Sequence, residues 1–199
     1  MPKNFLVLDF ETTGLDHKKE QVTEIAAIRY DENFNRIGSF HTYVKLWVDH
    51  GLSDFIKNLT GITEEKLAYG MHESDAMEII DNMIYEDTIV VAQYAPFDFS
   101  YLANYRVFPS NYICTKTLTN IAEPFEKSGL GATCERNGIE LKKAHTAMGD
   151  VLATAQLLKL RLDQGFGNYE NFVTEQPDRP LAFVPENTIK VLNTEDYKK

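Results

Sequence analysis

Residues 4–15 read NFLVLDFETTGL, and this stretch decides the fold. The run over residues 4–10 is almost continuously apolar and carries one acid, Asp9, as expected of a central strand that is buried on both faces. Residues 11–14, ETTG, then interrupt it. Asp9 and Glu11 are two positions apart, so an extended chain would place both side chains on one face. Two carboxylates at that range repel each other, whereas a bound Mg²⁺ or Mn²⁺ would make both charges favourable.

The segments after this strand have the patterns of further strands and helices. Residues 22–30 and 37–46 are rich in β-branched and aromatic residues and flank a polar turn, which predicts a meander of three strands. Helical patterns come next, and residues 88–93 and 111–114 again have the composition of strands. The most regular helical pattern covers residues 147–162, where apolar residues recur at intervals of three and four. This order indicates an α/β domain with a mixed sheet covered by helices and the first strand at its centre.

The character of the chain changes after Gly165. Three prolines interrupt a polar and aromatic tail, in which AFVP (182–185) and TIKVL (188–192) each have the composition of a short strand. We therefore divide the chain into a domain over residues 1–164 and a C-terminal extension over residues 165–199. The extension either packs back on its own domain or docks on another protein, for example a DNA polymerase.

Composition and charge narrow the class of protein. The 199 residues are 43% hydrophobic and 25% charged, which is typical of a folded globular domain. No apolar run approaches the roughly 20 residues of a membrane span, and we find no signal peptide, so we expect a cytoplasmic protein without membrane contact. The two cysteines, Cys114 and Cys134, lack the spacing of a zinc site. A net charge of −10 argues against broad binding of duplex nucleic acid, although bound metal ions would supply positive charge locally.

Three further side chains complete a candidate metal site. Asp98 comes after the strand at 88–93, where it either caps a helix or points over the sheet edge toward Asp9. Asp150 lies on the polar side of the last helix. His145 is five residues earlier and would point about 140° away from Asp150 on a continuous helix, so the two converge only if His145 lies in a preceding loop. Each residue alone has an ordinary structural explanation, and only their joint occurrence indicates a site for divalent metal ions.

The order of these motifs resembles that of a known family. Over residues 4–162 the chain is similar to the DEDDh branch of the 3′-to-5′ exonucleases, which includes polymerase proofreading domains, ribonuclease T and oligoribonuclease. The resemblance rests on five ordered motifs, which are LDFETTG (8–14), TGIT (60–63), AQYAPFD (92–98), LGATCERNGI (130–139) and AHTAMGDVLAT (144–154).

This resemblance implies a fold, a reaction and a set of site residues. The fold would be ribonuclease H-like, with a mixed five-stranded sheet flanked by helices, and the reaction would be phosphodiester hydrolysis with two ions of Mg²⁺ or Mn²⁺. His145 would take a proton from the attacking water. The ions would be held by four acids, Asp9, Glu11, Asp98 and Asp150.

The resemblance also implies a pocket for the 3′-terminal nucleotide. Its lining would come from the turn after the first strand and from Phe97. Where relatives often have His-Asn, this chain has Gln93-Tyr94, and the aromatic ring of Tyr94 either stacks on a base or fills a hydrophobic gap. The turn consists of Thr12, Thr13, Gly14 and Leu15.

We therefore expect a metal-dependent 3′-to-5′ exonuclease that releases nucleoside monophosphates from single-stranded DNA or RNA 3′ ends. Two other enzymes remain open, an exoribonuclease that trims RNA and a phosphodiesterase that acts on small oligonucleotides. A further alternative is a non-catalytic module that docks on a polymerase, but a pure scaffold would have no reason to keep all five candidate site residues.

Overall fold

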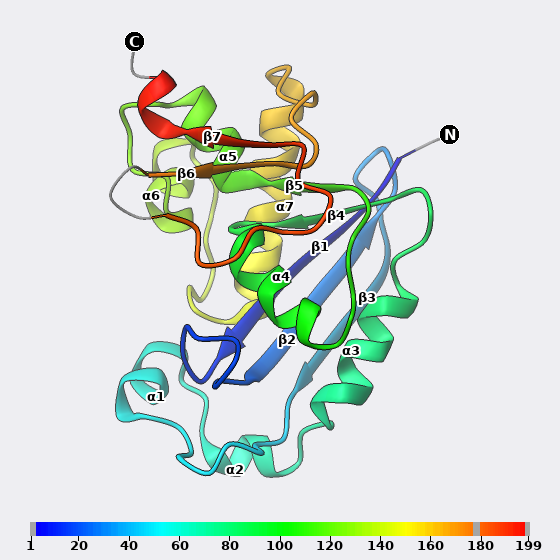
Figure 1. Ribbon diagram of the computed structural model, residues 1–199, viewed down its shortest axis with the longest axis vertical. Coiled ribbons are helices and arrows are strands. Elements are labelled where there is room, and N and C mark those ends of the chain that lie inside the picture. Colours follow the sequence, from blue (N-terminus) through cyan, green and yellow to red (C-terminus); the bar gives the residue numbers. More distant parts are fainter. Residues whose placement is uncertain (1–2, 177–179, 198–199) are drawn as a thin grey trace.

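A five-stranded sheet with the strand order β3-β2-β1-β4-β5 forms the centre of the computed structural model, which describes residues 3–176 and 180–197 (Figure 1). β1 pairs antiparallel with β2 and parallel with β4, so the sheet is mixed and the predicted fold class is confirmed. The strands are β1 (Asn4–Thr12), β2 (Val22–Tyr30), β3 (Arg36–Tyr43), β4 (Thr88–Ala92) and β5 (Tyr112–Cys114).

Helices cover both faces of this sheet. In Figure 1, α4 lies in front of the sheet and α7 lies behind it. α3 packs on the same face as α4, and α1 and α2 form a separate small cluster beyond β3. The helices are α1 (Asp54–Thr60), α2 (Glu64–Ala68), α3 (Glu73–Asn82), α4 (Ala95–Asn104), α5 (Thr115–Ala122), α6 (Leu130–Arg136) and α7 (Ala147–Asp163).

The alternation of side chains along β1 assigns its residues to two cores. Leu6 and Leu8 pack with α3 and α4, whereas Phe5 and Val7 pack with α7. Both faces of β1 are therefore buried, which explains the continuous apolar run in the sequence. By the same alternation Asp9, the next odd-numbered residue, belongs to the face that α7 covers.

The C-terminal extension returns to the domain. β6 (Phe172–Glu175) and β7 (Lys190–Asn193) form a parallel pair, and a 3₁₀ turn comes next at Thr194–Tyr197. β6 lies beside β5, where the backbone N–H of Asn171 donates to the Tyr112 carbonyl at 2.8 Å and Asn171 Oδ1 accepts from the Tyr112 N–H at 2.7 Å. The described part of the extension is thus attached to its own domain.

The sequence prediction for this extension was partly wrong. The strand expected at 188–192 overlaps β7, but residues 182–185 are not a strand, and β6 was missed. Phe183 packs onto the core cluster that includes α4 instead of joining a sheet. Composition alone could not distinguish a strand from an irregular segment that inserts one aromatic ring.

Within the described residues, no helix combines the length and the apolar content needed to cross a bilayer.

Candidate active site

Asp9 and Glu11 lie near the C-terminal end of β1, on the face covered by α7. β1 remains extended as far as Thr12, so the two side chains share this face as the sequence predicted. Glu11 is paired in register with Glu24 of β2. Three acidic side chains therefore meet at this end of the two central strands.

Asp98 reaches the same end of β1 from the first turn of α4. β4 pairs with β1 only as far as Val7, so the later backbone groups of β1 have no strand partner on that side. The N–H of Phe10 instead donates to Asp98 Oδ1 at 3.1 Å. This bond satisfies a buried backbone donor and fixes the Asp98 carboxylate beside Asp9. Asp98 thus joins α4 to the end of β1.

His145 and Asp150 come from the loop before α7 and from its first turn. Thr146 caps α7, because its Oγ1 accepts from the N–H of Gly149 at 3.3 Å. His145 therefore lies outside the helix, as its convergence with Asp150 requires, and has a left-handed backbone with φ of 61°. One ligand atom from each of Glu11, His145 and Asp150 lies within 4.8 Å of the other two.

The acids of this cluster hold their protons more strongly than ordinary carboxyl groups. Burial, followed by the charges of Asp98 and Asp150, raises the pKa of Asp9 well above its usual range. Burial also raises the pKa of Glu11 to about 8, helped by the charges of Asp150 and Glu24. The same cause raises the pKa of Asp98 to about 7 and that of Asp150 to about 6. Such a cluster is electrostatically unfavourable unless protons or cations neutralise it.

The cluster suits a hard divalent cation. Asp150 Oδ1 is buried and has no hydrogen-bond partner among the described residues. A buried polar atom without a partner is costly, and a cation at that point would satisfy it. Carboxylate oxygens are the ligands that Mg²⁺ and Mn²⁺ prefer. The residues present therefore fit the metal ions that the sequence predicted.

Glu24 is a member of the site that the sequence analysis missed. It is 3% exposed, its Oε1 lies 2.6 Å from His41 Nε2, and its Oε2 accepts from the Ala147 N–H at 3.3 Å. Glu24 thus links β2 and β3 to the first residue of the helix that carries Asp150. The signal was present in the sequence, because Glu24 is the one acid among the mainly apolar residues of VTEIAAIRY.

Gly149 is a second residue that the sequence analysis passed over. A Cβ atom at this position would lie 2.4 Å from the carbonyl oxygen of Lys142 and 2.6 Å from that of Lys143. The loop that carries His145 therefore rests directly on the backbone of the first turn of α7. Only glycine permits this close approach.

The residues predicted to line a nucleotide pocket lie beside the cluster. Thr12 and Thr13 are buried, and the Thr12 hydroxyl donates to the Gly14 carbonyl at 2.6 Å, which stabilises the turn. Leu15 is 84% exposed. Phe97, immediately before Asp98, is half-buried and meets Tyr101 edge-on with ring centroids 5.4 Å apart.

Gln93 and Tyr94, which stand where related exonucleases often have His-Asn, both have structural contacts. The Gln93 amide donates to the Ser128 carbonyl at 3.1 Å and its side-chain oxygen accepts from Thr115, so it ties three segments together. Tyr94 is half-buried against the core, and its ring is also covered by the Lys116 ammonium group, 4.4 Å from the ring centroid. One face of Tyr94 thus fills a gap while the residue still borders solvent.

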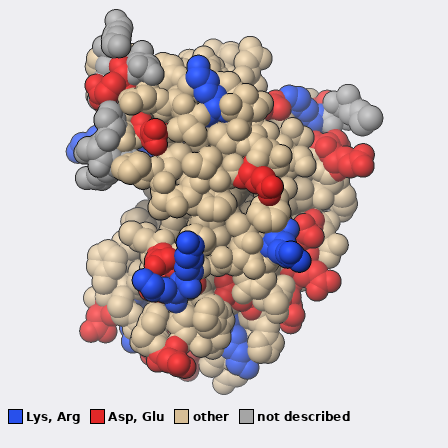
Figure 2. Space-filling view, viewed as in Figure 1, with Lys and Arg blue, Asp and Glu red and all other residues tan. Residues whose placement is uncertain are grey.

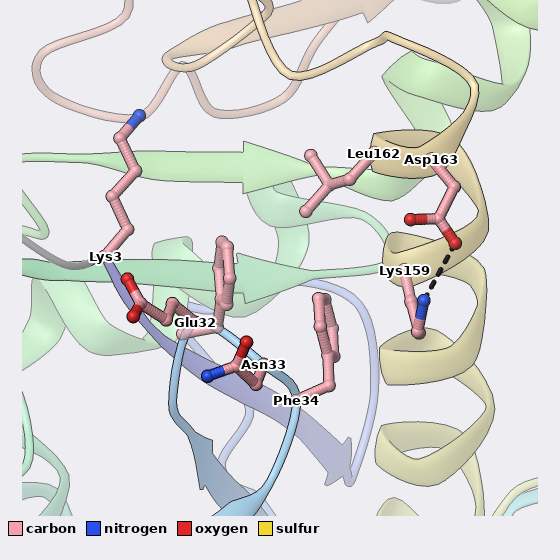
Figure 3. Close-up of a pocket in the computed structure, with 8 residues that line it drawn as sticks. Lys3, Glu32, Asn33, Phe34, Lys159, Leu162 and Asp163 are labelled. Carbon is pink, nitrogen blue, oxygen red and sulfur yellow. Dashed lines mark hydrogen bonds and ion pairs between the residues drawn. The ribbon is translucent and has the colours of Figure 1, made fainter.

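A pocket of about 570 Å³ lies at the other end of β1, away from the acidic cluster (Figure 3). Lys3, Phe34 and Asp163 are among its lining residues. Its lysines already have partners, since Lys159 pairs with Asp163 at 2.8 Å and Lys3 pairs with Glu170. Its described lining residues offer neither a cluster of acids nor an unpaired cation, so the acidic cluster remains the candidate active site.

Comparisons with known proteins agree with this geometry. A family model described as an exonuclease matches residues 6–158. The chain is 30% identical over 161 residues to a PolC-type DNA polymerase III of Thermotoga maritima, a match that covers 77% of this chain and 11% of that protein. It is 31% identical over 169 residues to the 3′-5′ exonuclease DinG of Staphylococcus saprophyticus, covering 80% of this chain and 18% of that protein. The chain therefore spans less than a fifth of the length of these relatives.

A solved structure shows the same architecture. The crystal structure of E. coli exonuclease I in complex with a dT13 oligonucleotide superposes with a TM-score of 0.71 at 25% sequence identity. The superposition covers 82% of this chain and 42% of that chain.

Proposed function

The chain belongs to the exonuclease family, and from this membership we propose that it is a metal-dependent 3′-to-5′ exonuclease that releases nucleoside monophosphates from single-stranded 3′ ends. The observation that carries the proposal is the convergence of Glu11, His145 and Asp150 within 4.8 Å. Glu11 is more than 130 positions away from the other two residues in the sequence, so their meeting is a product of the fold.

The four acids are the proposed ligands of the metal ions. Asp9, Glu11, Asp98 and Asp150 present oxygen atoms from two sides of the end of β1. Two bound ions of Mg²⁺ or Mn²⁺ would supply an activated water and stabilise the departing 3′ oxygen of the scissile bond. The raised pKa values of these acids support the assignment, because cations relieve the same repulsion that protons relieve in the free protein.

His145 is the proposed general base. It is exposed and lies on a loop, so its imidazole is accessible to a bound substrate. A ring nitrogen of His145 would take the proton of the attacking water, and the nearby carboxylates of Glu11 and Asp150 would stabilise the resulting imidazolium. The backbone of the loop, held against Gly149, would keep the ring in place during this transfer.

The turn after β1 is the proposed binding site for the terminal nucleotide. The Thr12 hydroxyl and the Gly14 carbonyl hold the turn together, and the Tyr101 hydroxyl also donates to that carbonyl at 2.8 Å. The exposed Leu15 side chain would then contact a base, with Phe97 on the neighbouring helix. Thr13 also stabilises the turn, since its hydroxyl donates to the Glu20 carboxylate at 2.5 Å.

Single-stranded DNA is the proposed substrate. The net charge of −10 disfavours a wide electrostatic grip on a duplex, whereas an unpaired end needs few contacts. The two sequence relatives are a DNA polymerase and DinG, and the superposed exonuclease I was crystallised with a DNA oligonucleotide. The polymerase relative and the DNA-bound exonuclease I favour DNA over RNA for this chain.

A substrate panel tests this proposal. Single-stranded DNA, single-stranded RNA, blunt duplex DNA and a dinucleotide, each labelled at the 5′ end, would be incubated with Mn²⁺ or with EDTA. We expect stepwise shortening of single-stranded DNA in Mn²⁺ only, and almost no shortening by Asp9→Ala, which lacks a ligand at the centre of the cluster. Cleavage of the dinucleotide alone would contradict the proposal, as would shortening that persists in EDTA.

A further inference from the structure

A small apolar pocket lies next to the acidic cluster, between the domain and its C-terminal extension. Its volume is about 200 Å³. Three segments line it: the turn after β1 through Leu15 and His17, the start of α4 through Tyr94 and Phe97, and the extension through Phe183. Phe183 lies outside residues 6–158, which the family model matches. One wall of this pocket therefore comes from outside the residues that the family model matches.

The contacts of Phe183 give this wall a defined position. Its ring meets the His17 ring edge-on, with centroids 5.7 Å apart, and packs against the core cluster that includes α4. His17 is held in turn by Asn104, whose side-chain amide donates to the His17 carbonyl at 2.6 Å. Phe183 is therefore attached to the β1 turn and, through Asn104, to the end of the helix that carries Asp98.

The pocket has the chemistry of a site for one aromatic ring system. Side chains such as Leu15, Phe97 and Phe183 present apolar surface, and the volume is below the roughly 300 to 1,000 Å³ of pockets that hold a drug-sized molecule. An unpaired nucleobase has flat faces that stack on aromatic side chains without regard to sequence. A base within a duplex is stacked on its neighbours and paired at its edge, so it would have to leave the duplex before it could enter such a pocket.

A second pocket, which contains a lysine, lies on the other side of Tyr94. Tyr94 separates the apolar pocket from this second, more polar pocket of about 260 Å³, which includes Lys116 and, from β6 of the extension, Thr174. The Lys116 ammonium group lies over the Tyr94 ring, 4.4 Å from its centroid, and Glu175 lines the same pocket. A strand with a base in the first pocket would thus pass close to a positively charged side chain.

The surface around these elements is shaped to admit a strand. Figure 2 shows the outline of the molecule indented between the part that contains β6 and β7 and the part that contains α1 and α2.

We propose that Phe183 of the C-terminal extension is a substrate-binding residue, which contacts an unpaired base of the strand whose 3′ end occupies the acidic cluster and so completes the proposed nucleotide pocket of Leu15 and Phe97. This inference rests on the proposed function. The extension is then part of the substrate-binding surface, and it favours single strands by accepting only a base that has left its pair.

The test measures binding separately from cleavage. Affinity for a fluorescent single-stranded DNA would be measured by anisotropy in Ca²⁺, which fills oxygen-ligand sites, for the wild type, Phe183→Ala and Phe183→Leu. Val184→Ala is the matched control, since Val184 is the next residue of the extension and is 49% exposed. Thermal unfolding of each variant would show that the domain remains folded.

We expect Phe183→Ala to weaken binding by roughly tenfold, the scale of one lost base stack, with a smaller loss for Phe183→Leu and none for Val184→Ala. Oligonucleotides that lack a base at the last, second-last or third-last position locate the contact. At one of these positions the wild type should bind as weakly as Phe183→Ala, and the substitution should cause no further loss.

Two results would overturn the inference. One is equal affinity of the wild type and Phe183→Ala, and the other is a loss in Phe183→Ala that persists with all three abasic oligonucleotides. An oligonucleotide that stays intact in Mn²⁺ while binding still depends on Phe183 would count against the proposed exonuclease activity and leave the pocket assignment standing.

Discussion

At the scale of single residues, the charges of the acidic cluster determine how the protein responds to pH and metal. Burial raises the pKa of Glu11 from 4.5 to about 8 and that of Asp98 to about 7. Between pH 3.8, the ordinary pKa of Asp98, and about pH 8, the folded protein without metal binds more protons than the unfolded chain. The contribution of these two groups to stability should therefore be greatest below pH 3.8 and should fall as the pH rises toward 8.

Bound metal ions should stabilise the folded protein more at high pH than at low pH. At pH 6 a cation must displace protons from both Glu11 and Asp98, whereas at pH 8 the proton of Asp98 is largely gone and Glu11 is about half deprotonated. We therefore expect Mn²⁺ to raise Tm by more at pH 8 than at pH 6, relative to EDTA at each pH. Thermal unfolding at the two pH values measures this directly. A Tm gain that is equal at both, or larger at pH 6, would contradict the assignment of these acids as ligands.

Glu24 should act on the metal without contacting substrate. Glu24→Gln removes one negative charge beside Glu11 but keeps a side-chain oxygen for the Ala147 N–H. We expect the Mn²⁺ concentration for half-maximal cleavage to rise by roughly 10- to 100-fold, as is usual for groups that support metal ligands. Glu73→Gln is the control, because Glu73 is also buried and accepts from the Val22 N–H, yet it lies outside the cluster. Equal responses of the two variants would remove Glu24 from the site.

At the scale of elements, the site depends on how the loop before α7 rests on the helix. The Lys142 and Lys143 carbonyls approach Gly149 too closely for any other residue. This contact, together with the Thr146 cap, determines where His145 emerges. His145, the proposed general base, is thus positioned by backbone packing, which is more rigid than a side-chain contact.

Gly149→Ala should therefore lower the rate while the metal stays bound. The added methyl group displaces the loop, so the cleavage rate should fall toward that of His145→Ala, roughly 10² to 10⁴ below the wild type. The Tm gain in Mn²⁺ should remain. Gly131→Ala in α6 is the matched control, since its Cβ would meet nothing nearer than Leu141 Cδ2 at 3.9 Å. Wild-type rates in Gly149→Ala would show that the loop tolerates the displacement.

The elements also show how far the sequence could predict the structure. The continuous apolar run of β1 and the helical period of α7 determine their own conformations, and both were predicted correctly. The importance of Glu24 depends on strand register, because only the pairing of Glu11 with Glu24 brings it to the site. The place of Phe183 depends on a contact with His17, which is 166 residues earlier in the chain. Periodicity within a segment carries no information about either contact.

At the scale of the whole molecule, the fold brings segments that are distant in the sequence to the C-terminal end of the central strand β1. The end of β1, the start of α4 and the start of α7 meet there, and each supplies at least one acid of the cluster. In the proposed function, the acidic surface and the attached extension would restrict access to unpaired ends. The central claim is that these parts act together to hydrolyse the last phosphodiester bond of a strand.

The most direct test of this claim is the cleavage pattern of a single-stranded DNA that carries a 5′ label. With Mn²⁺ the wild type should produce a ladder that shortens from the 3′ end by one nucleotide at a time. Asp150→Asn, which keeps the size of the side chain and removes the charge next to Glu11 and His145, should lose nearly all of this activity. A variant that shortens the strand as fast as the wild type, or internal cuts in place of a ladder, would contradict the account.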